Sequence, residues 1–162
     1  MPDPRINTLA DMLINYSTKL KKGEHILIEA FDIPEEMVIA CVRAARKAGG
    51  HPHVVLRNNR VMRALDMDAQ EDNLKVWADY DLHRMKLMQA YLGIRGSENV
   101  SELSDVPEAQ MKLKAKTYGK PVHFEQRVNH TKWCVLRWPT PSMAQLAQMS
   151  TEAFENFYFD VC

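Results

Sequence analysis

A helix flanked by two short apolar segments is the feature that most constrains the fold of this chain. Residues 25–30, HILIEA, predict one strand, and residues 52–56, PHVVL, predict a second. Between them, Pro34 followed by two glutamates indicates a helix start, and Gly49-Gly50 indicates its end. A strand, a helix of about four turns and another strand form a parallel crossover, which is right-handed in nearly all proteins.

Further segments on both sides of this unit alternate between helix and strand. Asp3-Pro4 predicts the start of an N-terminal helix with Ile6, Leu9, Leu13 and Tyr16 on one apolar stripe. Other predicted helices cover residues 61–65, about 69–88, 107–118, 142–149 and 151–162, and other predicted strands cover 91–96 and 131–137. The chain is therefore expected to be an α/β domain with an open, mainly parallel sheet of about four to five strands and helices on both faces.

Charge balance and the lack of long apolar runs exclude several classes of partner. The 162 residues are 46% hydrophobic and carry 21 basic and 21 acidic side chains, so no net field attracts nucleic acid or an anionic membrane. No apolar run approaches the ~20 residues of a membrane-spanning helix, and the N-terminus does not resemble a secretory signal. The cysteines at 41, 134 and 162 lack CxxC spacing, which favours reduced thiols. We expect a cytoplasmic protein.

The last predicted helix ends without a stop signal. Residues 157–162, FYFDVC, contain no Gly or Asn that would close a final helical turn, and no polar tail follows them. This favours the interpretation that the chain is the front part of a longer protein and that chemistry resides in residues outside these 162.

A polar loop follows the strand predicted at 91–96, the position where open α/β sheets bind ligands. The strand ends in residues 93–96, GIRG, and the two glycines indicate a tight backbone path. The spacing matches neither a dinucleotide fingerprint nor a P-loop, so a phosphate cradle is the less favoured of two interpretations. The candidate ligand contacts are Arg95, Ser97, Glu98 and Asn99. A plain strand-to-loop turn explains the same residues.

Other side chains are candidates for binding but have equally plain structural explanations. Arg57, Arg60 and Arg63 follow the strand at 52–56 and could grip a phosphate or carboxylate, or could be solvated. His51 and His53 alternate along a strand and could share a metal, but two ligands are too few for a metal site. No serine or cysteine has the neighbours of a nucleophile. The residues by themselves predict no complete active site.

Several short segments, taken in order, resemble the N-terminal domain of one group of metallo-aminopeptidases. They are DPRI at 3–6, KGE at 22–24, AGGHP at 48–52, YLGIRG at 91–96 and WPTPSMAQ at 138–145. Their order and spacing are similar to those of the aminopeptidase T and aminopeptidase S group, also called the thermophilic metalloprotease family. The resemblance extends over essentially the whole chain.

This resemblance implies a two-domain cytoplasmic exopeptidase that acts on peptides as a homodimer. In the family, a C-terminal domain holds two divalent metal ions, such as cobalt, zinc or magnesium, through Glu, His and Asp ligands. None of those ligands corresponds to a residue here, so we transfer no catalytic or metal-binding role. Residues 1–162 would be the N-terminal, non-catalytic domain, which supplies scaffold, dimer contacts and part of the substrate-chamber wall. The helix at 151–162 would pack against the missing domain.

Two other classes of function stay open at this point. The chain could be an autonomous α/β module that binds a small anionic ligand at the loops after its strands. It could also be a structural partner of a separately encoded catalytic chain.

Overall fold

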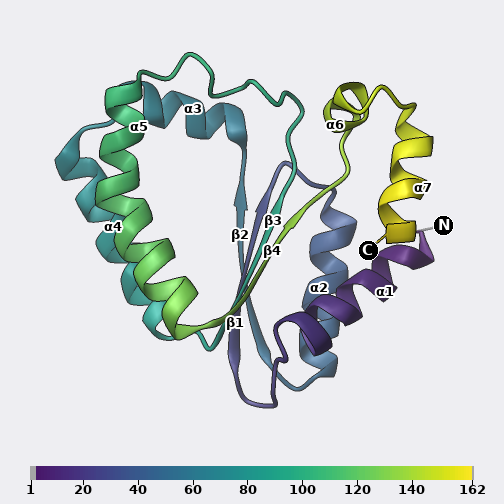
Figure 1. Ribbon diagram of the computed structural model, residues 1–162. Helices are drawn as coiled ribbons and strands as arrows, with labels where there is room; N and C mark the ends of the chain where they lie inside the picture. The colour runs from purple at the N-terminus through teal and green to yellow at the C-terminus, as the bar shows by residue number, and fades with distance from the viewer. Residues whose placement is uncertain (1–2, 162) are drawn as a thin grey trace.

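The computed structural model describes residues 3–161 and contains an open sheet whose strands all run parallel. The strands are β1 (His25–Phe31), β2 (His51–Arg57), β3 (Ala90–Arg95) and β4 (Lys132–Arg137), in the spatial order β2-β1-β3-β4 (Figure 1). The predicted parallel crossover is confirmed, because α2 (Glu35–Lys47) joins β1 to its neighbour β2. The strand order reverses between β1 and β3, which makes their carboxyl ends the topological switch point of the sheet.

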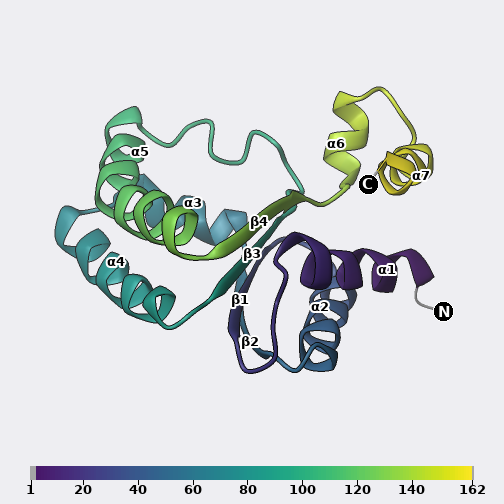
Figure 2. The ribbon, with the colours of Figure 1, turned by 60° about the horizontal axis from the view of Figure 1, so that its bottom comes forward.

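Helices cover both faces of the sheet, as predicted (Figures 1 and 2). On the side that we call the α2 face lie α2, α1 (Pro4–Met12) and the π-helical turn η1 (Leu13–Ser17). On the opposite side, which we call the α4 face, lie α3 (Asn59–Met67), α4 (Glu71–Lys86), α5 (Glu108–Lys114) and the π-helical segment η2 (Ala115–Val128). After β4 come α6 (Pro141–Leu146) and α7 (Thr151–Val161).

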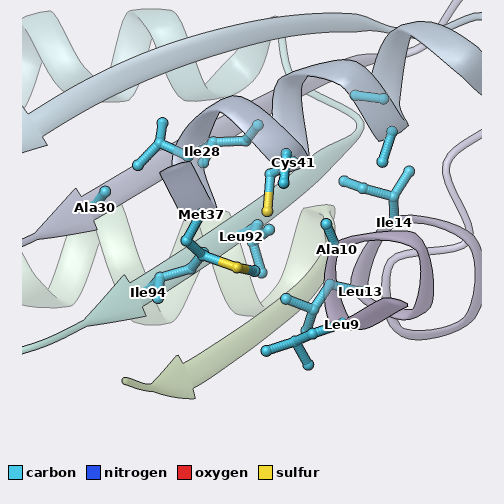
Figure 3. Packing of buried hydrophobic residues seen from close by; sticks show 14 of the residues in the cluster. Leu9, Ala10, Leu13, Ile14, Ile28, Ala30, Met37, Cys41, Leu92 and Ile94 are labelled. Atoms are coloured by element: carbon cyan, nitrogen blue, oxygen red, sulfur yellow. The ribbon is translucent and has the colours of Figure 1, made fainter. Parts of the chain in front are cut away.

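The α2 face is packed with aliphatic side chains. Alternate residues of β1 and β3, among them Ile28 and Leu92, point towards α2 and are fully buried (Figure 3). From the helix, Met37, Cys41 and Ala44 meet them at the i, i+4, i+7 spacing of one helical face. Fully burying an aliphatic side chain such as Ile28 or Leu92 contributes roughly 1.5–3 kcal/mol, so this layer is a major contributor to the stability of the fold.

The C-terminal helix lies beside the N-terminal one. The Arg5 guanidinium stands 4.5 Å from the centre of the Phe159 ring, and Arg5 also donates a 2.9 Å hydrogen bond to Asn156. Asp3 caps α1, as predicted from Asp3-Pro4. The predicted end of α7 at Cys162 falls outside the described residues. No helix within residues 3–161 is both long and apolar enough to cross a membrane.

Two sequence expectations about helices were wrong. Tyr16 was expected on the buried stripe of the first helix but is 74% exposed, because the chain winds into η1 and its wider turn brings Ile14 to the core instead. The helix predicted at 107–118 continues through η2 as far as Val128, although Gly119 and Pro121 lie inside it. A π-helix bonds to the fifth residue back, and this changed pattern accommodates a proline that would interrupt an α-helix.

Candidate functional site

The last residues of the strands form a row across the carboxyl edge of the sheet. In register, Arg57 of β2 is paired with Phe31 of β1, Phe31 with Arg95 of β3, and Arg95 with Arg137 of β4. Register partners in a parallel sheet point to the same side, and in this row that side is the α4 face. Phe31 and Arg95 therefore lie at the switch point, where open α/β sheets bind ligands, and Arg57 and Arg137 flank them on the outer strands.

Arg57 is already occupied by partners within the fold. Its Nε donates to Glu29 Oε1 at 2.5 Å, and its Nη2 donates to Asp81 Oδ2 at 3.1 Å. The guanidinium also lies 5.2 Å from the ring centre of Trp77. The Arg57 side chain is only 14% exposed, and its guanidinium donors are engaged within the fold. This differs from the sequence-based suggestion that Arg57 binds a phosphate or carboxylate.

Arg57 belongs to a network of charges buried on the α4 face. Glu29 is 2% exposed and also accepts a 2.7 Å hydrogen bond from the Tyr91 hydroxyl and pairs with Arg127 at 3.2 Å. Burial alone would raise the pKa of Glu29, but Arg127 and Arg57 outweigh it and hold that pKa below its ordinary value. Gly93 leaves room for this contact, because a Cβ there would stand 2.9 Å from the Tyr91 hydroxyl oxygen.

A second carboxylate, Asp81 of α4, completes the network. It accepts hydrogen bonds from Arg57, from Arg84 at 2.6 Å and from the Tyr118 hydroxyl at 2.5 Å. Burial raises the pKa of Tyr118, so its hydroxyl stays protonated and donates. The network ties β1, β2, β3, α4 and η2 together, which gives these residues a structural role.

Arg95 and Arg137, by contrast, have no ion-pair partner within residues 3–161. Arg95 is half-buried, its guanidinium lies 5.8 Å from the Phe31 ring centre, and its buried Nε makes no hydrogen bond to the described residues. Both arginines line an open cavity of about 430 Å³, which we call the strand-end hollow. Ser97 and Asn99 line it too, so the structure brings three of the four predicted loop residues together.

Glu98 and Arg60 lie elsewhere. Both are exposed and line a neighbouring depression beside the start of α3. Arg63 forms an ion pair with Asp105. Of the six candidate residues, Arg95, Ser97 and Asn99 share the strand-end hollow, Glu98 and Arg60 share the second depression, and Arg57 is buried in the charge network.

The loop after β3 is fixed from both sides. Gly96 N donates to Phe31 O at 2.7 Å, and a Cβ at Gly96 would come within 2.4 Å of Asp32 O, which confirms the tight backbone path. Asn59 Nδ2 donates to Gly96 O at 3.0 Å, and Ser142 Oγ donates to Ser97 O at 2.6 Å. These bonds hold the rim of the strand-end hollow between α3 and α6.

Sequence reasoning missed Arg137, Asn59 and Ser142. Arg137 closes the strand predicted at 131–137, so the rule that drew attention to Arg95 would also have found it. Asn59 and Ser142 carried no comparable signal, because each acts on a backbone carbonyl far away in sequence.

A histidine cluster lies near the opposite, amino-terminal edge of the sheet. His25 Nδ1 and His53 Nε2 are 2.9 Å apart, and the rings of His25 and His51 are 4.9 Å apart. Burial and the neighbouring His25 and His51 lower the pKa of His53. Within residues 3–161, no group of three or more His, Cys, Asp or Glu side chains is arranged to hold a metal ion. The described residues therefore do not fit the metal pair that the resemblance implies, and we derive no chemical step through it.

Comparisons with known proteins agree with this fold. The family model described as "Thermophilic metalloprotease (M29)" matches residues 3–162. Among solved structures, wild-type AmpT from Thermus thermophilus superposes with a TM-score of 0.72 at 16% identity, over 96% of this chain and 42% of that chain. A CurK enoyl reductase structure has a TM-score of 0.38 at 13% identity over 97% of this chain and 48% of its own, too low to carry an argument. A search of curated proteins gave no match.

Proposed function

Because the chain belongs to the thermophilic metalloprotease family, we propose that it is the non-catalytic α/β domain of a cytoplasmic, two-domain metallo-aminopeptidase that releases N-terminal amino acids from peptides. One observation carries this proposal. The family match extends over residues 3–162, and the fold covers 96% of this chain but only 42% of the AmpT chain. In this proposal, the 162 residues correspond to the N-terminal domain, and a further domain corresponds to the part of the AmpT chain that they do not cover.

The metal ions of such an enzyme would be held by the further domain. Two divalent ions, for example cobalt, zinc or magnesium, supply Lewis-acid activation of the peptide carbonyl and of water. This chain's own residues contribute a rigid scaffold and a wall with a polar hollow at the carboxyl edge of the sheet.

Exposed apolar side chains near the C-terminal helices support a contact with a further domain or a second subunit. Leu146 after β4 is 69% exposed, and Phe157 and Val161 of α7 are 52% and 63% exposed. Clusters of exposed apolar side chains mark interaction surfaces on soluble proteins. We propose that α6 and α7 pack against the catalytic domain and that homodimer contacts complete the chamber.

The test compares the 162-residue chain with the product of the complete open reading frame that encodes it. Each is assayed for hydrolysis of a leucyl reporter with cobalt, zinc or magnesium. We expect turnover from the longer product and none from the 162-residue chain. Robust turnover by the 162-residue chain, or an open reading frame that ends at Cys162, would overturn the proposal.

A second candidate function is an autonomous module that binds a small anionic ligand. The favouring observation is the strand-end hollow with two arginines that form no ion pair in the part of the chain that the structure describes. Thermal-shift measurements with nucleotides separate the two functions. A nucleotide at a hundredfold excess over its Kd would stabilise such a module by about 2.7 kcal/mol, whereas no nucleotide shift is expected for the aminopeptidase domain.

A further inference from the structure

Arg95, which is half-buried, and Arg137, which is exposed, are like charges placed side by side, and neither forms an ion pair within residues 3–161. They are register partners on neighbouring strands, which lie ~4.8 Å apart. Like charges directly opposite one another destabilise a sheet, and a buried polar atom is normally hydrogen-bonded. Arg95 violates the second rule as well, since its buried Nε lacks a partner among the described residues. An external anion in the strand-end hollow would satisfy both requirements.

The donors of two guanidinium groups on adjacent strands match the acceptors of a carboxylate. Each guanidinium offers up to five N–H donors in a planar fork, and a carboxylate has two oxygens with about four acceptor positions. Two arginines on adjacent strands can therefore each donate to one carboxylate, with the strength of charge-assisted bonds.

The other charges in the hollow favour an anion with a single negative charge. Lys114 is neutralised by Asp66, to which it donates a 2.6 Å hydrogen bond. Glu102 also lines the hollow and contributes one negative charge. Two free arginines and one glutamate leave a single positive charge, which a carboxylate balances and a phosphate dianion exceeds.

Apolar side chains complete the lining. Phe31, Leu103 and Met143 surround the same space as Arg95 and Arg137. Ligand sites in proteins combine such an apolar lining with a few fixed polar groups. The hollow can therefore accept an apolar residue that ends in a carboxylate.

We propose that Arg95 and Arg137 bind the C-terminal carboxylate of a short peptide, with its last side chain against Phe31, Leu103 and Met143. This inference rests on the proposed function, because it assigns a specific contact to the chamber wall. It makes the enzyme favour short peptides whose far end reaches this wall.

The binding test uses N-acetylated trialanine, which has no free amino group and is not a substrate for an aminopeptidase. Its binding to the 162-residue chain is followed by NMR shifts of backbone amides at residues 95–99. We expect saturable shifts, with Kd raised about tenfold or more in Arg137→Gln, since a charge-assisted bond is lost. Arg43→Gln removes an equal charge from an exposed position on α2 and should leave Kd unchanged.

Two further measurements distinguish a peptide carboxylate from inorganic phosphate, and a conservative variant controls for misfolding. The C-terminal amide of the same peptide should bind about tenfold more weakly or worse, and inorganic phosphate should not compete at equal concentration. Arg137→Lys keeps the charge but loses the fork, so we expect intermediate binding. Absence of peptide binding, equal binding of the amide, or tighter binding of phosphate would overturn the proposal.

In the complete enzyme the same pair acts as positioning residues. Arg137→Gln should raise KM for trialanine about tenfold with little change in kcat, and should leave trialaninamide unaffected. The NMR arm is independent of turnover, so a failure of the aminopeptidase assignment and a failure of the carboxylate site give different results.

Discussion

On the α2 face, β1 and β3 present Ile28 and Leu92 to the helices, whereas on the α4 face the neighbouring residues of the same strands are Glu29 and Tyr91. The first layer is held by area removed from water, which tolerates changes of shape. The second contains ions that are stable only while each has its partner. One sheet thus combines an adaptable side with a side whose geometry is specified residue by residue.

The difference also separates the arginines at the strand ends. Arg57 forms ion pairs with Glu29 and Asp81. Arg95 and Arg137 form no ion pair with any acidic side chain among the described residues. The position of the buried carboxylates therefore explains why Arg57 is ion-paired and the other two arginines are not.

The largest expected effect comes from removing the central ion of the α4 face. Glu29→Ala leaves Arg57 and Arg127 buried without their shared carboxylate, so we expect a loss of about 3–5 kcal/mol in the free energy of unfolding. Urea denaturation monitored by circular dichroism measures it. A loss below about 1 kcal/mol would show that the network is not structural.

A smaller loss is expected one residue away on the α2 face. Ile28→Val deletes one methylene from a fully buried aliphatic site, so we expect about 0.5–1.5 kcal/mol. Urea denaturation at pH 5 and pH 8 should give the same difference from the wild type, because no ion is involved. A difference that changed with pH would contradict the contrast between the faces.

A pH effect of intermediate to small size is expected at the histidine cluster. The pKa of folded His53 is lowered by burial and by His25 and His51, so the unfolded chain takes up this proton first, near the ordinary pKa of about 6.5. The contribution of His53 to the free energy of unfolding is therefore fully present above that pH, and it is lost as the pH drops towards the lower pKa of the folded state. His53→Gln should flatten the decline between pH 7 and pH 5, and the half-buried His123, whose pKa is also lowered by burial, should account for part of the remainder. If the free energy of unfolding of His53→Gln declined between pH 7 and pH 5 as steeply as that of the wild type, His53 would not be a source of the pH dependence.

The smallest effect is expected for Glu108, which is ion-paired like Glu29 but exposed to solvent. Glu108 pairs with Lys112 at 2.6 Å, yet its side chain is 81% exposed. Glu108→Ala should change the free energy of unfolding by at most about 0.5 kcal/mol, which the same urea titration resolves against Glu29→Ala. Equal losses at the two sites would remove the distinction between buried and solvated pairs.

The parts of the fold that sequence reasoning predicted are those with local signals. The β1, α2 and β2 unit follows from apolar runs, an acidic first turn and a Gly-Gly stop within one short stretch. The general rule that ligands bind at the loop after a parallel strand drew attention to Arg95, Ser97 and Asn99, and the structure places these three residues around one cavity. These signals need no knowledge of what lies across the sheet.

The parts that were missed depend on contacts far apart in the chain. Arg57 looked free because its partners Glu29 and Asp81 are 28 and 24 residues away. The row at the strand ends exists only once the spatial order β2-β1-β3-β4 is known. Likewise, no local rule predicts that a helix passes through Gly119 and Pro121 by widening its turns.

Two consecutive carbonyl groups in the loop after β3 are held by opposite flanks of the molecule. Gly96 O is bound by Asn59 at the start of α3, and Ser97 O by Ser142 at the start of α6. The loop is thus hydrogen-bonded to both flanks, and a displacement of α6 would shift the loop backbone next to Arg95. The proposed docking at the C-terminal helices and the proposed anion site are therefore separated by a single peptide unit, so the first would be felt at the second.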